Sequence, residues 1–123
     1  MTIADTDVLI DFLSAKGEAT TVERLIQQDM LRTTVVTRFE LLSGARSAKQ
    51  QARLLQLLAA VPSLPLDDRA ADAASEIRRS LERTGMPIGM ADSLIAGIVS
   101  TNGGVLLTRN RSHFERVPSI RLA

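Results

Sequence analysis

The stretch IADTDVLIDFL, residues 3–13, sets three aspartates among six large apolar side chains. Acidic residues disfavour strands and are costly to bury without a partner. The apolar pattern predicts a short strand over residues 2–5 and a helix over residues 8–15. Asp5 then ends a strand, which is where α/β sheets form their sites. Asp11 lies one helical turn beyond Asp7, and we expect it to face solvent.

The rest of the chain alternates between short apolar runs and amphipathic segments. Glycine and proline separate many of them, and the apolar run before Arg109 has the composition of a central parallel strand. Such alternation predicts a parallel sheet with helices on both faces. The expected strands are residues 32–36, 63–66, 105–108 and 119–122, and the expected helices are residues 20–28, 37–44, 49–60, 67–84, 91–100 and 110–114.

Composition excludes several classes of protein. The 123 residues favour one domain, residues 1–123, and a hydrophobic content of 45% excludes a disordered chain. The absence of cysteine excludes disulfides, thiolate catalysis and cysteine-based zinc sites. We see no signal peptide and no apolar run of the ~20 residues that a membrane span needs, so we expect a cytoplasmic protein without a membrane partner.

Four oxygen-bearing side chains fall near predicted strand-to-helix junctions in four separate parts of the chain: Asp5, Glu40, Asp92 and Asn110. Each has a simpler reading as a helix cap. Asp5, Asp7, Asp92 and Asn110 are residue types that cap helices, and Thr37 with Glu40 forms the pattern of a capping box. The sequence taken one residue at a time does not decide between capping and a site.

The combination favours a site. Glu40 and Asp92 are each followed by apolar residues, so we expect their helices to be largely buried and their carboxylates to have little contact with solvent. Converging carboxylates repel one another unless a cation neutralises them. Mg²⁺ and Mn²⁺ prefer such all-oxygen ligands. The four junctions therefore predict a divalent metal site.

Four blocks in order carry a resemblance that covers essentially the whole chain. They are DTDVLIDFL (residues 5–13), TRFELLSGA (37–45), GMPIGMADSLIAGIV (85–99) and LLTRNRSHFERVPSIRL (106–122). Together they resemble the PIN-domain ribonucleases of the VapC toxin type. This resemblance implies a three-layer α/β/α sandwich around a parallel sheet, and cleavage of RNA that depends on Mg²⁺ or Mn²⁺.

The resemblance also implies roles for individual residues. The family's three metal-binding acids match Asp5, Glu40 and Asp92, and its fourth catalytic position, often Asp, matches Asn110. An amide is a neutral ligand, so the sequence leaves open whether one or two ions bind. Positions beside the acids match Thr6, Asp7 and Thr108. Arg109, Arg111 and Arg116 are candidates to contact RNA phosphates, with a solvated arginine-rich edge as the alternative, and His113 is expected at the rim.

Partners follow from the same resemblance. VapC-type toxins are held by a cognate VapB-type antitoxin, whose C-terminal segment crosses the toxin, and they commonly form homodimers. Leu54, Leu55, Leu57 and Leu58 offer more apolar surface than one helix face can hide. That surface fits a dimer, unless both faces of the helix are buried within one chain.

Rival classes fit less well. The start D-T-D-V-L also matches haloacid-dehalogenase-type phosphatases, which need a downstream lysine, whereas both lysines here, Lys16 and Lys49, are early. A phosphoreceiver domain needs a phospho-acceptor aspartate near the middle of the chain and a late lysine, and this sequence has no late lysine. The rival that stays open is a PIN fold that binds RNA or an antitoxin without cutting, because Asn110 replaces a carboxylate.

Overall fold

The computed structural model describes all 123 residues and has a five-stranded parallel sheet at its centre, with strand order β3-β2-β1-β4-β5. β1 lies in the middle and pairs with β2 on one side and β4 on the other; Thr2 is opposite both Leu31 and Val105. The strand order therefore reverses between β1 and β4, where open α/β sheets bind ligands. The strands are β1 (Thr2–Ala4), β2 (Leu31–Thr34), β3 (Ser63–Leu64), β4 (Val105–Leu107) and β5 (Arg121–Leu122).

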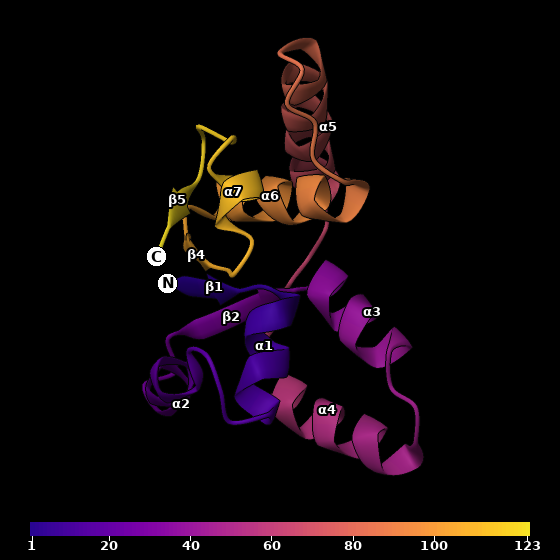
Figure 1. Cartoon of the computed structure of the whole chain (residues 1–123), viewed down its shortest axis with the longest axis vertical. Helices are drawn as coiled ribbons and strands as arrows, with labels where there is room; N and C mark the ends of the chain where they lie inside the picture. Colours follow the sequence, from indigo (N-terminus) through magenta and orange to yellow (C-terminus); the bar gives the residue numbers. More distant parts are fainter.

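Helices cover both faces of the sheet, which confirms the predicted three-layer α/β/α architecture. Figure 1 shows α1 to α4 on one side and α5 to α7 on the other, with α5 packed against α6. The helices are α1 (Thr6–Leu13), α2 (Ala19–Gln27), α3 (Val35–Ser43), α4 (Ala48–Ala60), α5 (Asp68–Arg83), α6 (Met90–Asn102) and α7 (Arg111–Phe114). None of them is long and apolar enough to cross a membrane.

Two apolar cores fill the spaces between the layers. Successive residues of a strand point to opposite faces, so Ile3 and Leu106 pack under α5 and α6 while Ala4 and Leu107 pack under α1 and α4. All four side chains are at most 9% exposed. Burial on both faces explains why β1 and β4 each end on consecutive apolar residues.

The second strand is shorter than its sequence predicts. We expected a strand over residues 32–36, but β2 ends at Thr34, and the β-branched Val35 and Val36 begin α3. The Thr34 hydroxyl accepts a hydrogen bond from the backbone N–H of Thr37 at 3.1 Å and so caps the helix. The alternative reading of Thr37 and Glu40 as a capping box is therefore not realised, because Thr34 caps the helix one turn earlier and leaves Glu40 free for another contact.

The leucine-rich helix α4 hides most of its apolar surface within the chain. Leu54, Leu57 and Leu58 are buried in the core under α1, whereas Leu55 is 42% exposed. The alternative that α4 packs within one chain therefore holds for three of the four leucines. The homodimer stays a prediction.

Candidate functional site

The site begins where β1 and β4 end side by side. Asp5 follows β1, Thr108 follows β4, and the Thr108 hydroxyl donates a 2.6 Å hydrogen bond to Oδ2 of Asp5. Asp5 is only 7% exposed. The parallel pairing of the two strands thus brings residues from opposite ends of the chain into one buried contact.

The second oxygen of Asp5 has no partner. Its Oδ1 is buried and accepts no hydrogen bond. Burial raises the pKa of Asp5 from 3.8 to about 6; the charges of Asp7 and Asp92 add to the rise, while the Thr108 hydroxyl and the Val8 backbone N–H oppose it. The Val8 N–H falls short of a capping hydrogen bond. An unpartnered buried carboxylate oxygen facing like charges is a place where a cation would be stabilising.

A second group of contacts joins Asp92 to the loop after β4. The amide nitrogen of Asn110 donates to Oδ2 of Asp92 at 3.1 Å, and Nδ1 of His113 lies 3.1 Å from the same oxygen. The side-chain nitrogen Nδ2 of Asn110 lies 2.8 Å from Nδ1 of His113. The backbone N–H of Asn110 donates to the Thr108 hydroxyl at 2.9 Å, so this group is continuous with the Asp5 contact.

Glu40 is held separately. Its Oε1 accepts a 2.7 Å hydrogen bond from the hydroxyl of Thr6, which directly follows Asp5. The Thr37 hydroxyl lies 3.2 Å from that of Thr6. We expected Glu40 to have little contact with solvent, and this was wrong: Leu41, its neighbour in α3, turns into the core while Glu40 itself is exposed.

Helix capping does not account for the four oxygen-bearing side chains. Asp5 and Asn110 stand at the cap positions of α1 and α7, yet neither side chain makes a capping hydrogen bond. Gly89 is the cap residue of α6, so Asp92 lies inside its first turn. Because Thr34 caps α3, Glu40 bonds to Thr6 instead. The alternative left open by the sequence is therefore not realised at any of the four positions.

The carboxylates of Asp5, Glu40 and Asp92 do not converge on one point in this structure. No group of three or more histidine or acidic side chains has its donor atoms close enough together to hold an ion. Asp92 is engaged by Asn110 and His113, and Glu40 by Thr6. The residue that fits a cation best is Asp5, through its free buried Oδ1.

Asp11 contradicts the expectation that it faces solvent. It is 4% exposed, and its Oδ2 lies 3.1 Å from Nε of Arg109. Asp7 is half exposed and pairs with the same guanidinium at 3.6 Å. The sequence offered no local signal for this burial, because the compensating arginine lies 98 positions further along the chain.

The three arginines proposed to contact RNA have separate partners within the chain. Arg109 pairs with Asp7 and Asp11 on α1. Arg111 donates a 2.6 Å hydrogen bond to the carbonyl of Ala123, and Arg116 donates a 2.9 Å bond to that of Pro87. Their role toward RNA stays a prediction. His113 was expected only at the rim, although a spacing of three residues on a helical turn brings it beside Asn110.

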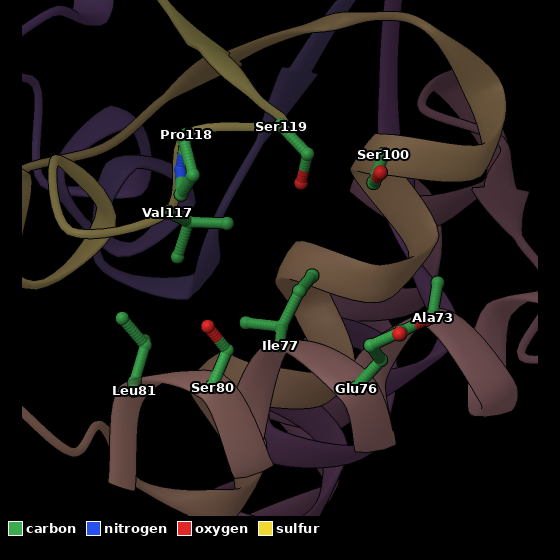
Figure 2. A pocket seen from close by; sticks show the side chains of 9 residues that line it. All are labelled: Ala73, Glu76, Ile77, Ser80, Leu81, Ser100, Val117, Pro118 and Ser119. Atoms are coloured by element: carbon green, nitrogen blue, oxygen red, sulfur yellow. The ribbon is translucent and has the colours of Figure 1, made fainter. Parts of the chain in front are cut away.

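Two open cavities flank the structure at different distances from these acids. A cavity of about 310 Å³ lies between α5, α6 and the segment before β5, and Figure 2 shows that Glu76 is the one acid that lines it. A second cavity, of about 300 Å³, lies between α1, α3 and α4; Glu40 lines it together with Ile10, Leu41 and Leu54. Only the second cavity reaches the candidate site.

The chain belongs to the PIN-domain family, whose model matches residues 2–120. The predicted family is thereby confirmed. This chain is 31% identical over 121 residues to the tRNA(fMet)-specific endonuclease VapC of Shigella flexneri, a match that covers 95% of this chain and 92% of the relative.

Solved structures agree with this assignment. DNA-bound VapBC from Salmonella typhimurium contains a chain with 29% identity and a TM-score of 0.84, covering 99% of this chain and 96% of the other. VapBC2 from Rickettsia felis, at 21% identity, has the same fold with a TM-score of 0.84 and covers 99% of this chain and 96% of its own.

Proposed function

We propose that this protein is a metal-dependent endoribonuclease that acts as the toxin of a type II toxin–antitoxin pair. The observation that carries the proposal is the buried carboxylate of Asp5, which keeps one oxygen free at the junction of β1 and β4. Membership of the PIN-domain family and similarity to proteins named VapC endonuclease support the same reading.

Asp5, Asp92 and Glu40 are the proposed ligands of Mg²⁺ or Mn²⁺. A bound divalent ion would supply Lewis-acid stabilisation of the phosphate and a lower pKa for its water. Thr108 holds one oxygen of Asp5 and so orients the free one. Asn110 fixes the carboxylate of Asp92 through its side-chain amide. Glu40, exposed and tied only by Thr6, has the freedom to turn toward the other two acids.

The proposed partner is a VapB-type antitoxin. The cavity between α1, α3 and α4 is open, is partly apolar through Ile10 and Leu54, and has Glu40 at its edge. An antitoxin segment seated there could pack apolar side chains into the cavity and bring a basic side chain to the acidic site. Structures of VapBC pairs with the same fold support this part of the proposal.

The experiment is cleavage of RNA by the purified, antitoxin-free protein. Total cellular RNA and initiator tRNA, chosen because the Shigella relative is named for it, are incubated with Mg²⁺, with Mn²⁺ and with EDTA. Discrete fragments that disappear with EDTA and in the Asp92→Asn variant are the expected result. The fragment ends would then define the RNA and the cleavage sequence.

A catalytically silent binding module is the second candidate. Asn110 in place of a fourth carboxylate, and acids that do not converge on one point, favour it. It predicts that the wild-type protein leaves RNA intact in every reaction and that Asp5→Asn leaves binding or toxicity on expression unchanged. Toxicity that disappears in Asp5→Asn, from a protein that stays folded, would exclude the silent module.

A further inference from the structure

Arg109 ties the loop after β4 to helix α1. Its Nε lies 3.1 Å from Oδ2 of Asp11, and its Nη2 lies 3.6 Å from Oδ1 of Asp7. Asp11 is 4% exposed, whereas Asp7 is half exposed. Since exposed ion pairs contribute little and breaking a buried one leaves an uncompensated charge, the contact with Asp11 is the stronger of the two.

The turn after α1 encloses this carboxylate. Backbone N–H groups of Ser14 and Lys16 donate to the carbonyl of Asp11, so the chain folds back over the end of the helix. Gly17 follows with φ of +61°, and a Cβ atom there would lie 2.7 Å from Oδ2 of Asp11. Arg109 is the one basic residue that forms an ion pair with Asp11. The carboxylate therefore has a single charged partner and little access to water.

The position of Arg109 in the chain gives the ion pair its significance. The residue before it, Thr108, bonds to Asp5, and the residue after it, Asn110, bonds to Asp92. An arginine whose guanidinium is fixed on α1 restrains the backbone between these two contacts. Loss of the restraint would let both move together.

We infer that Asp11 and Arg109 are positioning residues, whose ion pair holds the loop of residues 108–110 against α1 and thereby keeps Asp5 and Asp92 in place. The inference deepens the proposed nuclease function and rests on it for its catalytic consequence. It assigns Arg109 a use different from the phosphate contact that the sequence suggests, and the two uses make opposite predictions for Asp11.

The first test measures hydrogen exchange of the Asn110 backbone amide, which donates to Thr108 and needs neither metal nor RNA to be observed. Asp11→Asn, Arg109→Gln and the double variant are compared with wild type. Arg78→Gln is the matched control, because it removes an exposed ion pair, with Glu82, on α5. We expect each single variant to speed exchange at Asn110 about tenfold, within the range of couplings between contacting residues, and the double variant to be no faster.

The same variants should leave exchange unchanged in the core strands, for instance at the Val105 amide of β4, which donates to the carbonyl of Met1, and the control should change neither site. Unchanged exchange at Asn110 in both single variants would overturn the inference. If either single variant does not fold, the double variant Asp11→Asn/Arg109→Gln decides, because it removes the ion pair without leaving a buried carboxylate uncompensated.

The second test separates positioning from RNA contact. Positioning predicts that kcat falls about ten- to a hundredfold in both single variants with KM little changed, as expected for a misplaced catalytic group. A phosphate contact predicts weaker RNA binding and a smaller salt dependence for Arg109→Gln alone, with Asp11→Asn unaffected. That second pattern would overturn the inference. If the wild type cleaves no RNA, the proposed function fails, and the exchange measurement still decides whether the pair positions the loop.

Discussion

The hydroxyl of Thr108 lies 2.6 Å from Oδ2 of Asp5, a contact between residues 103 positions apart. It exists because β1 and β4 are neighbours in register, with Ala4 opposite Leu107, so that the next residue of each strand emerges at the same edge of the sheet. The contact occupies one carboxylate oxygen and leaves the other buried and free. The chemistry of the site thus depends on a pairing that no local segment contains.

Replacing Thr108 by valine should destabilise the protein and alter Asp5. The hydroxyl donates to Asp5 and accepts from the backbone N–H of Asn110, so its removal leaves buried polar groups unpaired at a cost of about 1–3 kcal/mol. In the wild type the hydrogen bond from Thr108 lowers the pKa of Asp5, so its loss should raise that pKa further. Urea unfolding measures the first effect and NMR titration of the Asp5 carboxyl the second. Thr108→Ser keeps the hydroxyl and should show neither change.

Asp5 should make the metal-free protein less stable as the pH rises. Its pKa is about 6 in the folded chain against 3.8 for an unperturbed aspartate, so the folded state binds more protons between these values. Stability linked to this group is therefore intact below about pH 4, falls between pH 4 and 6, and is lost above that range. The full difference is about 3 kcal/mol, at about 1.4 kcal/mol per pKa unit.

Asp5→Asn isolates this effect, since the amide has the same shape and does not titrate. In EDTA the variant should be more stable than wild type at pH 7, and the advantage should vanish near pH 4. Unfolding by urea at several pH values measures both. An advantage that does not change with pH would show that Asp5 titrates normally in the folded protein.

Much of the site could be predicted from local sequence, because strand ends and helix starts are local features. Asp5, Asn110 and Thr108 each follow a short apolar run, and the structure places all three at the carboxyl edge of the sheet. His113 was within reach of the same reasoning, since it lies three residues after Asn110 on a helical turn and meets both Asn110 and Asp92.

What the sequence could not predict depends on contacts across the chain. Asp11 looked like a solvated helix residue because nothing near it compensates a buried charge; its partner, Arg109, comes from the loop after β4. The helix α3 began earlier than expected because the Thr34 hydroxyl outweighs the strand preference of Val35 and Val36. In both cases a tertiary or capping contact overrode the preference of single residues.

Added Mg²⁺ or Mn²⁺ should raise the melting temperature of the antitoxin-free protein. An ion that binds only the folded state stabilises it by about 2.7 kcal/mol at a hundredfold excess over Kd. Asp5→Asn and Asp92→Asn should each reduce the shift, whereas Glu76→Gln, which lines the distant cavity on α5, should leave it unchanged. Thermal unfolding with and without metal at pH 7 is the measurement. Equal shifts in all four proteins would place the bound ion elsewhere.

Gly17 and Gly85 should differ in their tolerance of alanine. Both have positive φ, +61° and +73°, so alanine costs about 1–2 kcal/mol of backbone strain at either position. At Gly85 a Cβ meets nothing within 4 Å, whereas at Gly17 it would lie 2.7 Å from Oδ2 of Asp11. That oxygen can retreat only by leaving Arg109. Gly17→Ala should therefore cost more, as measured by urea unfolding.

The excess cost should depend on the carboxylate itself. An Asp11→Ala background removes the 2.7 Å contact with Oδ2 and leaves only the 3.2 Å contact with the Cβ of residue 11, so most of the excess cost of Gly17→Ala over Gly85→Ala should disappear. In the otherwise wild-type chain, Gly17→Ala should also speed hydrogen exchange of the Asn110 amide, because the displaced carboxylate of Asp11 releases Arg109 and the loop that follows β4. Equal costs at the two glycines in the wild-type background would mean that the turn yields around Asp11, and that the carboxylate is free to move without disturbing the site.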